Sequence, residues 1–320
     1  MAVTSMSQSS IANYGKRNTF NQPIIVLGAN EEALVGGYQY YLFTESSALT
    51  IVQGNITAEI LCVGAGGSGG SGNSGVGAGG GAGAIEGAGP GYYASQNLAA
   101  GSYGIAVGAS AGRATSTSGS NGGDTVFTGT STITALGGGG GSLSNSLGLD
   151  GGSGGGGASV NSSSIAGGAA SGNNTFAGGT ATGQTGNWYV GAGGGGATAV
   201  GASATANTPG AGGEGLALTT IDANLTSGNF TAFTGMTVIS SGGGGANVRQ
   251  DTGTMSFGAD GGTGAGRGAS SGASYTSGYQ EATDPTSFGS GGGGGASHGS
   301  ADFKDGRAGY SGLVIVRYAV

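Results

Sequence analysis

Glycine is concentrated in a few runs, and the longest of them occupies residues 64–91. This stretch reads GAGGSGGSGNSGVGAGGGAGAIEGAGPG and contains 15 glycines in 28 residues, whereas the 63 residues before it contain five. Shorter runs recur along the chain at 137–141, 151–157, 191–196, 242–245 and 291–295. Because glycine loses more backbone entropy on ordering than any other residue, these runs constrain what the chain can fold into.

Three structures compete as interpretations of such runs. Glycine makes up 82 of 320 residues, about a quarter, and at this content a flexible, disordered linker is the usual interpretation. A collagen triple helix requires glycine at every third position and abundant proline, which the four prolines and uneven spacing exclude. The third structure is a lattice of extended polyglycine helices with about three residues per turn, whose backbone groups bond to neighbouring helices.

The segments between the runs favour the lattice. Short apolar segments rich in β-branched and aromatic residues alternate with the glycine, and a disordered tract lacks such segments. Strands are predicted at 38–43, 48–52, 56–63, 216–221 and 230–240, with one hairpin at 92–98 and 102–107 and another at 124–127 and 131–136. The final run, LVIVRYAV at 313–320, is predicted to be a buried central strand that pairs with a segment such as 56–63.

We therefore predict an all-β fold with polyglycine II helices. Short antiparallel strands form a sandwich-like base, and glycine-rich extended helices pack as a lattice that reaches roughly 30 Å from it, at about 3.1 Å per residue. Residues 38–320 constitute this domain. Residues 1–37, which contain Lys16 and Arg17 and little glycine, are predicted to be an attachment or oligomerisation segment, with a loose terminus as the alternative.

Charge and hydropathy exclude several classes of partner. The chain has 15 acidic and eight basic residues and a net charge of −7, so no basic surface for nucleic acid is expected. No apolar stretch approaches the 18 or so residues of a membrane span. The N-terminus lacks the apolar region of a signal peptide, so we expect synthesis in the cytoplasm and release by lysis or by a dedicated machine.

Enzyme and cofactor motifs occur only as by-products of the glycine content. Residues 64–69 match the dinucleotide-binding pattern G-x-G-x-x-G, which requires a helix that begins at the third glycine. The residues that follow are rich in glycine, which disfavours a helix. The hydrolase pattern G-x-S-x-G around Ser68 and Ser153 needs a following helix and a histidine, and His298 is the only histidine. Cys62, the only cysteine, is interpreted as a small buried residue. We expect no enzymatic activity, no cofactor and no metal site, with calcium in an acidic loop left open.

The order of several segments resembles the glycine-rich domain of bacteriophage tail-fibre proteins. FTESSALTIVQGNITAEILCVGAGGSGG resembles its opening, YYASQNLAAGSYGIAVGASAG and NGGDTVFTGTSTITALGGGGGS its next segments, and GLVIVRYAV its closing strand. The resemblance covers about residues 38–320, and the order of the segments is more specific than any one of them. MAVTSMSQSSIANYG also resembles the starts of some marine phage virion proteins.

The resemblance implies a function as well as a fold. It implies a non-enzymatic adhesin at a tail-fibre tip, located in the virion, whose loops between glycine runs bind a glycan or outer-membrane protein of the bacterial host. Residues 1–37 then attach the chain to other tail or fibre subunits. The alternative is a purely structural fibre or decoration protein without receptor binding, and an ice-binding or silk-like protein ranks last because regular triplets are missing. Host, receptor and oligomeric state, including a homo-oligomer, stay open.

The longest segments that are neither strand nor pure glycine are three polar inserts at 171–190, 247–257 and 270–289. Aromatic side chains there are candidate receptor contacts, because they offer a large rigid area with a polar group, although packing against the lattice is the alternative. Arg249 is suited to an acidic glycan, and an ion pair with Asp251 is the alternative that the sequence favours. If the glycine runs alternate between two ends of a lattice, all three inserts share one end. The candidates are Asn187, Trp188, Tyr189, Arg249, Tyr275, Tyr279 and Phe288.

Overall fold

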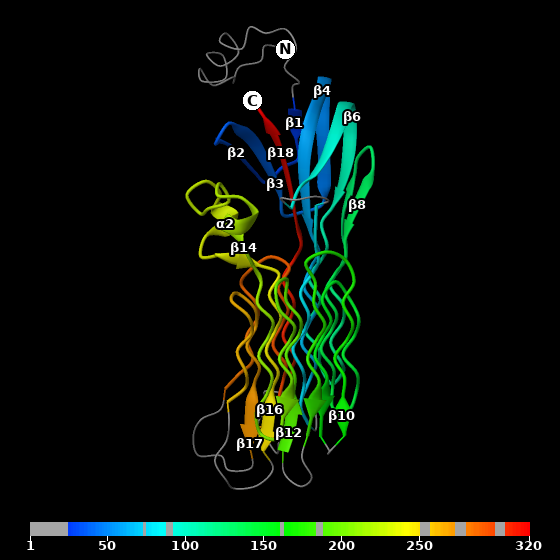
Figure 1. The fold of residues 1–320 in the computed structure, drawn as a ribbon, viewed down its shortest axis with the longest axis vertical. Coiled ribbons are helices and arrows are strands. Elements are labelled where there is room, and N and C mark those ends of the chain that lie inside the picture. Colours follow the sequence, from blue (N-terminus) through cyan, green and yellow to red (C-terminus); the bar gives the residue numbers. More distant parts are fainter. Residues whose placement is uncertain are drawn as a thin grey trace, which may run out of the picture.

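The structure, a computed structural model, describes residues 25–72, 75–87, 92–160, 163–183, 188–249, 257–272, 280–297 and 305–320. Three parts follow one another along its long axis (Figure 1): a nine-stranded sheet, a bundle of extended glycine-rich runs, and a group of short strands. We call the end with the nine-stranded sheet proximal and the opposite end distal.

The proximal sheet is antiparallel throughout, and the last strand in the chain lies in its interior, between β3 and β4. Its main path runs β2-β3-β18-β4-β6-β7-β8, and β1 and β5 pair with β4. Val316 of β18 lies between Tyr41 of β3 and Ile60 of β4, which confirms the predicted central strand and its predicted partner. The strands are β1 (Ile25–Leu27), β2 (Glu31–Val35), β3 (Tyr38–Phe43), β4 (Ser47–Val63), β5 (Ile85–Glu86), β6 (Ala94–Ala106), β7 (Thr125–Thr128), β8 (Thr132–Ala135) and β18 (Leu313–Ala319).

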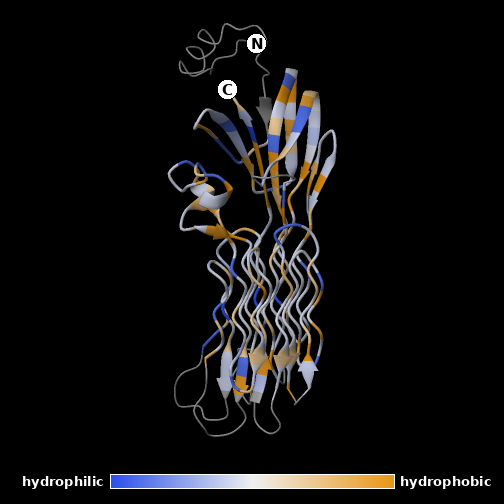
Figure 2. Ribbon diagram, in the orientation of Figure 1, coloured by the Kyte–Doolittle hydropathy of each residue, from blue (hydrophilic) through white to orange (hydrophobic). Residues whose placement is uncertain are grey.

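Alternation along the central strand directs side chains into two hydrophobic cores. Leu313 and Ile315 enter a first core, which also contains the residues of the segment 216–239 that cover this face of the sheet. Val314 and Val316 enter a second core on the other face. Phe127 of β7 also belongs to this second core, which therefore extends across several strands of the sheet. Figure 2 shows that apolar residues are most frequent at this end.

The all-β prediction is confirmed, but several boundaries differ. The segments 48–52 and 56–63 form one 17-residue strand, β4, with a register irregularity between Ile51 and Asn55. The hairpin predicted at 92–107 is wrong, because β6 continues through the glycine at 101 as one strand. The long β4 supplies backbone partners on both sides of that glycine, which keeps β6 extended.

The segment 216–240 is only partly extended. β14 (Leu216–Ala217) pairs with β15 (Val238–Ile239), and between them lie α2 (Leu218–Ile221) and the 3-10 helix η1 (Thr231–Phe233). Apolar residues three positions apart, such as 218 and 221 or 230 and 233, share one side of a helical turn and are buried here. A short apolar run does not distinguish a turn of helix from a strand, which explains the wrong prediction.

Partly buried ion pairs of one arginine with two carboxylates hold this segment against the sheet. The Nε of Arg317 in β18 donates to the carboxylate of Glu59 at 2.6 Å, and its terminal nitrogen contacts the carboxylate of Asp222. The hydroxyl of Tyr40 donates to the same Asp222 carboxylate at 2.6 Å, and burial is the main cause that raises the pKa of this tyrosine. The guanidinium also lies 4.0 Å from the ring centre of Tyr93. The segment 216–240 is therefore tied to the strands that it covers.

The sheet begins before residue 38. β2 and β3 form a hairpin across Gly36 and Gly37, whose φ values of 60° and 80° suit glycine. The boundary predicted between 37 and 38 therefore divides a hairpin. Residues 1–24, which make up most of the predicted attachment segment, lie outside the described residues.

The glycine-rich runs bond laterally with a period of three. In the run 64–72, successive residues donate to three different neighbouring runs in turn, and every third residue returns to the same neighbour. The N–H groups at 64, 67 and 70 donate to the run 78–84, those at 65, 68 and 71 to 117–123, and those at 66 and 69 to 307–310. We call these laterally bonded runs the glycine lattice.

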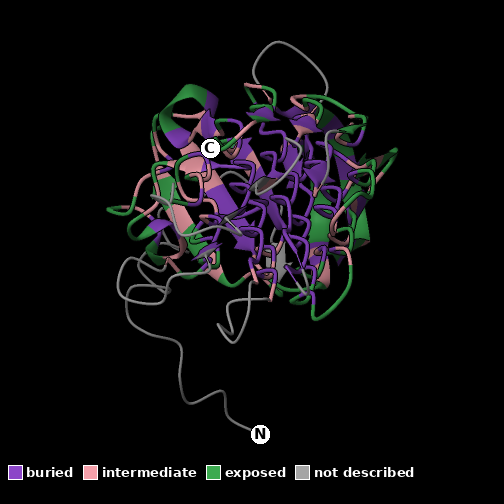
Figure 3. Ribbon diagram, turned by 90° about the horizontal axis from the view of Figure 1, so that it is seen from below, coloured by how far each residue is buried: buried purple, intermediate pink, exposed green. Residues whose placement is uncertain are grey.

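The next run repeats the arrangement, so the pattern is not confined to one segment. The N–H groups at 78, 81 and 84 donate to the run 136–142, those at 77, 80 and 83 to 289–295, and those at 79 and 82 to 192–195. Seen from the distal end, the interior runs are buried and the outer ones exposed (Figure 3). The interior of the lattice therefore consists largely of backbone packed against backbone.

Glycine is required here because the backbones are too close for side chains. A Cβ added to Gly67 would overlap the carbonyl oxygen of Gly139, and one added to Gly139 would overlap the carbonyl oxygen of Leu149. Larger residues occur instead along particular rows, as at 65, 68 and 71, where alanine and two serines are buried. The period of three therefore also decides where alanine and serine are tolerated.

Gly139→Ala should destabilise the protein by about 2–3 kcal/mol, because the new methyl group pushes two bonded backbones apart. Gly112→Ala is the matched control, since no heavy atom lies within 4 Å of the position that its Cβ would take. The control should range from neutral to about 1 kcal/mol more stable. Denaturant unfolding measures both, and equal stability of the two variants would contradict close backbone packing.

The single cysteine is a buried core residue, as the sequence predicts. Cys62 is fully buried in the second core, and burial raises the pKa of its thiol to about 12. The charge of Glu86 acts in the same direction, whereas a backbone hydrogen bond with Phe127 acts against it.

Cys62 should therefore resist a disulfide reagent such as DTNB at pH 8 in the native protein. At this pH only roughly one thiol in 10,000 is ionised, because the native pKa lies about four units higher. In denaturant the thiol regains an ordinary pKa near 8.5 and should react completely. Rapid reaction of the native protein, followed by absorbance at pH 8, would show that the second core opens readily.

Candidate binding surface at the distal end

Short strands close the distal end of the glycine lattice in two small sheets. One has the order β17-β16-β12-β9, and the other β10-β11-β13. Figure 1 places them opposite the nine-stranded sheet. The first contains β9 (Ala158–Ser159), β12 (Trp188–Gly191), β16 (Asn247–Arg249) and β17 (Ser270–Gly272); the second contains β10 (Ser164–Ile165), β11 (Ala181–Thr182) and β13 (Ala204–Thr205). We call the first the distal sheet.

The register of the distal sheet brings the three polar inserts together. Trp188 in β12 lies opposite Arg249 in β16, and Arg249 in turn lies opposite Gly272 in β17. β12 ends the insert 171–190, β16 begins 247–257 and β17 begins 270–289. The three inserts therefore meet at the strands that begin or end them, but the prediction that all three lie at one end is wrong for 171–190 and 270–289, each of which also reaches the proximal end.

Small apolar side chains fix these strands on the lattice. Val248 of β16 is fully buried in a cluster composed mostly of alanine, and Tyr189 of β12 packs against that cluster. Val190, which alternates with Tyr189 along β12, is buried in a neighbouring cluster with Ala181 and Ala204. The backbone of β12 is thus held from both faces, while the glycine run that follows it continues into the lattice.

The structure describes the side chain of some predicted site residues, only the backbone of others, and leaves the rest outside the described ranges. Tyr189 is half-buried at the distal sheet. Trp188 and Arg249 are placed there by backbone register alone. Asn187, Tyr275 and Tyr279 lie outside the described residues.

Phe257 is an exposed aromatic residue that the candidate set omits. Its side chain is 65% exposed, and the chain returns from it into the lattice, where Ala259 donates to the carbonyl of Gly245 near β16. It ends the polar insert 247–257 immediately before a glycine. The criterion that selected the other aromatic residues applies equally to this position, so the sequence contains the signal for it.

Phe288 lies at the other end of the molecule. It is 4% exposed in the first core, and its ring packs edge-on against Phe233 and Tyr310. The structure therefore does not bring it together with Trp188 and Tyr189. The insert 270–289 begins at the distal sheet and ends in the proximal core, so it runs the length of the lattice instead of forming one loop.

The insert 171–190 also begins at the proximal end. The backbone N–H and the side-chain amide of Asn173 donate to the carboxylate of Glu86 at 2.8 and 2.6 Å, next to β5. Asn174 donates its side-chain amide to the carbonyl of Ile85 at 3.1 Å. Only the last part of this insert, from β11 onward, therefore belongs to the distal end.

Within the described ranges, no group of three or more histidine, cysteine, aspartate or glutamate side chains is arranged to hold a metal ion. In the same part of the chain, every helix is too short or too polar to cross a membrane. What the distal end offers is aromatic and backbone surface on a rigid support.

The comparison with known families covers almost the whole described fold. A family described as the glycine-rich domain matches residues 43–319. No curated protein matches the chain. Because the family match extends from the end of β3 to the end of β18 and spans the entire lattice, the chain belongs to the glycine-rich domain family.

Proposed function

We propose that the runs of the glycine lattice are polyglycine II helices. Donation to three neighbours in turn, with a return after three residues, is the pattern that a helix with about three residues per turn produces. A flat strand directs its N–H groups to two sides only and does not generate this pattern.

An experimental structure should give φ near about −75° and ψ near about +145° along residues 64–72. Values near about −140° and +135°, typical of antiparallel strands, would contradict the polyglycine II assignment.

We propose that the protein is a non-enzymatic adhesin of a bacteriophage tail fibre, which binds the bacterial surface through its distal end. The observation that carries this proposal is the convergence of β12, β16 and β17 in one sheet at the free end of a rigid lattice. A rigid support lowers the entropic cost of binding, because the loops that it carries are already positioned. Exposed or half-buried aromatic residues at this end supply large contact areas.

The remaining parts of the proposal rest on the resemblance to tail-fibre proteins. The receptor is a surface glycan or an outer-membrane protein, and the protein resides in the virion. Residues 1–37 attach it to other tail or fibre subunits, and in support of this the described strands of that segment, β1 and β2, belong to the proximal sheet and not to the distal sheet. This arrangement separates attachment to the particle from contact with the host.

The replacement of Trp188 and Tyr189 together by alanine should reduce attachment of the purified protein to host cells. A true hot-spot aromatic contributes about 2 kcal/mol, which is roughly thirty-fold in affinity. Phe257→Ala should act in the same direction, because this side chain is exposed near the same end. Attachment of the fluorescently labelled protein to a panel of bacterial strains, with competition against phage infection, provides the measurement.

Phe176→Ala is the matched control. Phe176 is 37% exposed and follows the proximal turn at Asn173, so its loss should leave attachment unchanged. Circular dichroism and thermal unfolding confirm that each variant is folded. Unchanged attachment after replacement of all three distal aromatics would favour a purely structural fibre or decoration protein.

A further inference from the structure

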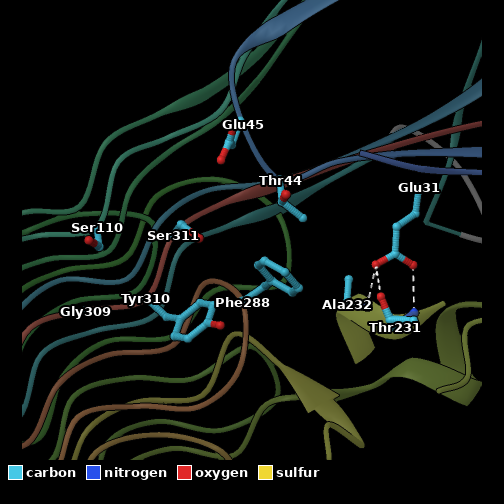
Figure 4. A pocket seen from close by; sticks show the side chains of 10 residues that line it. All are labelled: Glu31, Thr44, Glu45, Ser110, Thr231, Ala232, Phe288, Gly309, Tyr310 and Ser311. Carbon is cyan, nitrogen blue, oxygen red and sulfur yellow. Dashed lines mark hydrogen bonds between the residues drawn. The ribbon is translucent and has the colours of Figure 1, made fainter. Parts of the chain in front are cut away.

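A cleft of about 520 Å³ lies at the proximal end, where the sheet, the segment 216–240 and the glycine lattice meet (Figure 4). Each of the three contributes to its walls: Glu31, Thr44 and Glu45 from the sheet region, Thr231 from η1, and Tyr310 from the lattice. The cleft is therefore separate from the distal sheet. The cleft is wide open to solvent, and its volume lies within the range of sites that hold a small molecule.

The wall between the sheet and η1 is held in place by Glu31. Its carboxylate accepts hydrogen bonds from the backbone N–H of Thr231 at 2.7 Å, the hydroxyl of Thr231 at 2.6 Å and the backbone N–H of Ala232 at 2.7 Å. On the sheet side, the backbone N–H of Thr44 donates to the side chain of Asn30 at 2.7 Å. The two walls are fixed without a ligand.

An aromatic pair forms the lattice side of the cleft. The rings of Phe288 and Tyr310 are perpendicular, with 5.4 Å between their centres. The backbone of Tyr310 is bonded on both sides, since its N–H donates to Ser290 and its carbonyl accepts from Gly66, both at 2.9 Å. Phe288 is buried, whereas Tyr310 is only partly buried and offers an apolar surface to a ligand.

The charges of the lining have one sign. Among the described residues that line the cleft, Glu31 and Glu45 are the only charged ones, and none is a lysine, arginine or histidine. The Glu31 carboxylate already accepts three hydrogen bonds, whereas Glu45 is exposed and has no ion-pair partner among the described side chains. The hydroxyls of Ser110 and Ser311 also line the cleft. A ligand that carries a positive charge and several hydroxyl groups matches this lining, and an anion is repelled by it.

We propose that this cleft binds an amino sugar. The protonated amine pairs with the carboxylate of Glu45, the ring hydroxyls bond to the serine and threonine hydroxyls, and the apolar face of the sugar ring packs against Tyr310. This site is additional to the distal surface and does not depend on it. The amino sugar is thus a second ligand of the protein, bound at the proximal end, whereas the proposed host contact is at the distal end.

Titration of the full-length protein with glucosamine, glucose and glucuronate, followed by saturation-transfer NMR, tests the proposal. Glucosamine should bind more tightly than glucose by about threefold to fivefold, the size expected for one exposed ion pair, and glucuronate should not bind. Glu45→Gln should reduce the affinity for glucosamine to that for glucose. Tyr310→Ala should weaken both, because both use the aromatic contact.

Glu32→Gln is the matched control for Glu45→Gln. Glu32 is exposed, lies next to Glu31 in β2 and does not line the cleft. The control variant makes the same change in net charge and should leave glucosamine binding unaltered, as should Tyr189→Ala at the distal sheet. Three results would overturn the proposal: no binding of glucosamine up to its solubility limit, equal binding of glucuronate, or equal effects of Glu45→Gln and Glu32→Gln.

Discussion

The lateral hydrogen bond between glycine backbones is the interaction on which the rest of this structure depends. Each interior run bonds to several others, as when Gly64, Ala65 and Gly66 donate to three different runs. Such bonds require backbones so close that an added Cβ would overlap a carbonyl group. The entropic cost of ordering this much glycine is high. The lateral hydrogen bonds offset this entropic cost because many runs are ordered together, so that each bond positions two runs at once.

The lattice needs both of its ends. At the proximal end, β4 leads into the first run and β18 follows the last one, and the two strands pair in the nine-stranded sheet. At the distal end, small apolar clusters around Val190 and Val248 align the short strands of neighbouring runs. The ends supply the hydrophobic burial that a glycine run lacks, and the lattice supplies a rigid connection between them.

The same arrangement separates two surfaces of different chemistry. The distal end has the half-buried Tyr189 in the distal sheet and the exposed Phe257 near it, on segments that carry the polar inserts. The proximal cleft is acidic and lies where Glu31 bonds the segment 216–240 to the sheet. Because the lattice bonds in all lateral directions, neither surface can shift relative to the other without breaking many backbone hydrogen bonds.

The sequence alone determined the features that depend on local composition. The continuous apolar run 313–320 indicated a buried central strand, the isolated Cys62 indicated a core residue, and the alternation of apolar segments with glycine indicated an ordered lattice with strands at its ends. The tertiary structure decided which segments meet. Glu31 bonds to Thr231, 200 residues away, and Phe288 packs in the proximal core, although it belongs to an insert that begins at the distal sheet. Glycine runs are nearly identical in sequence, so nothing in their residues specifies which runs are neighbours. Their neighbours are selected by the strands at each end, whose side chains differ and pack in only one arrangement.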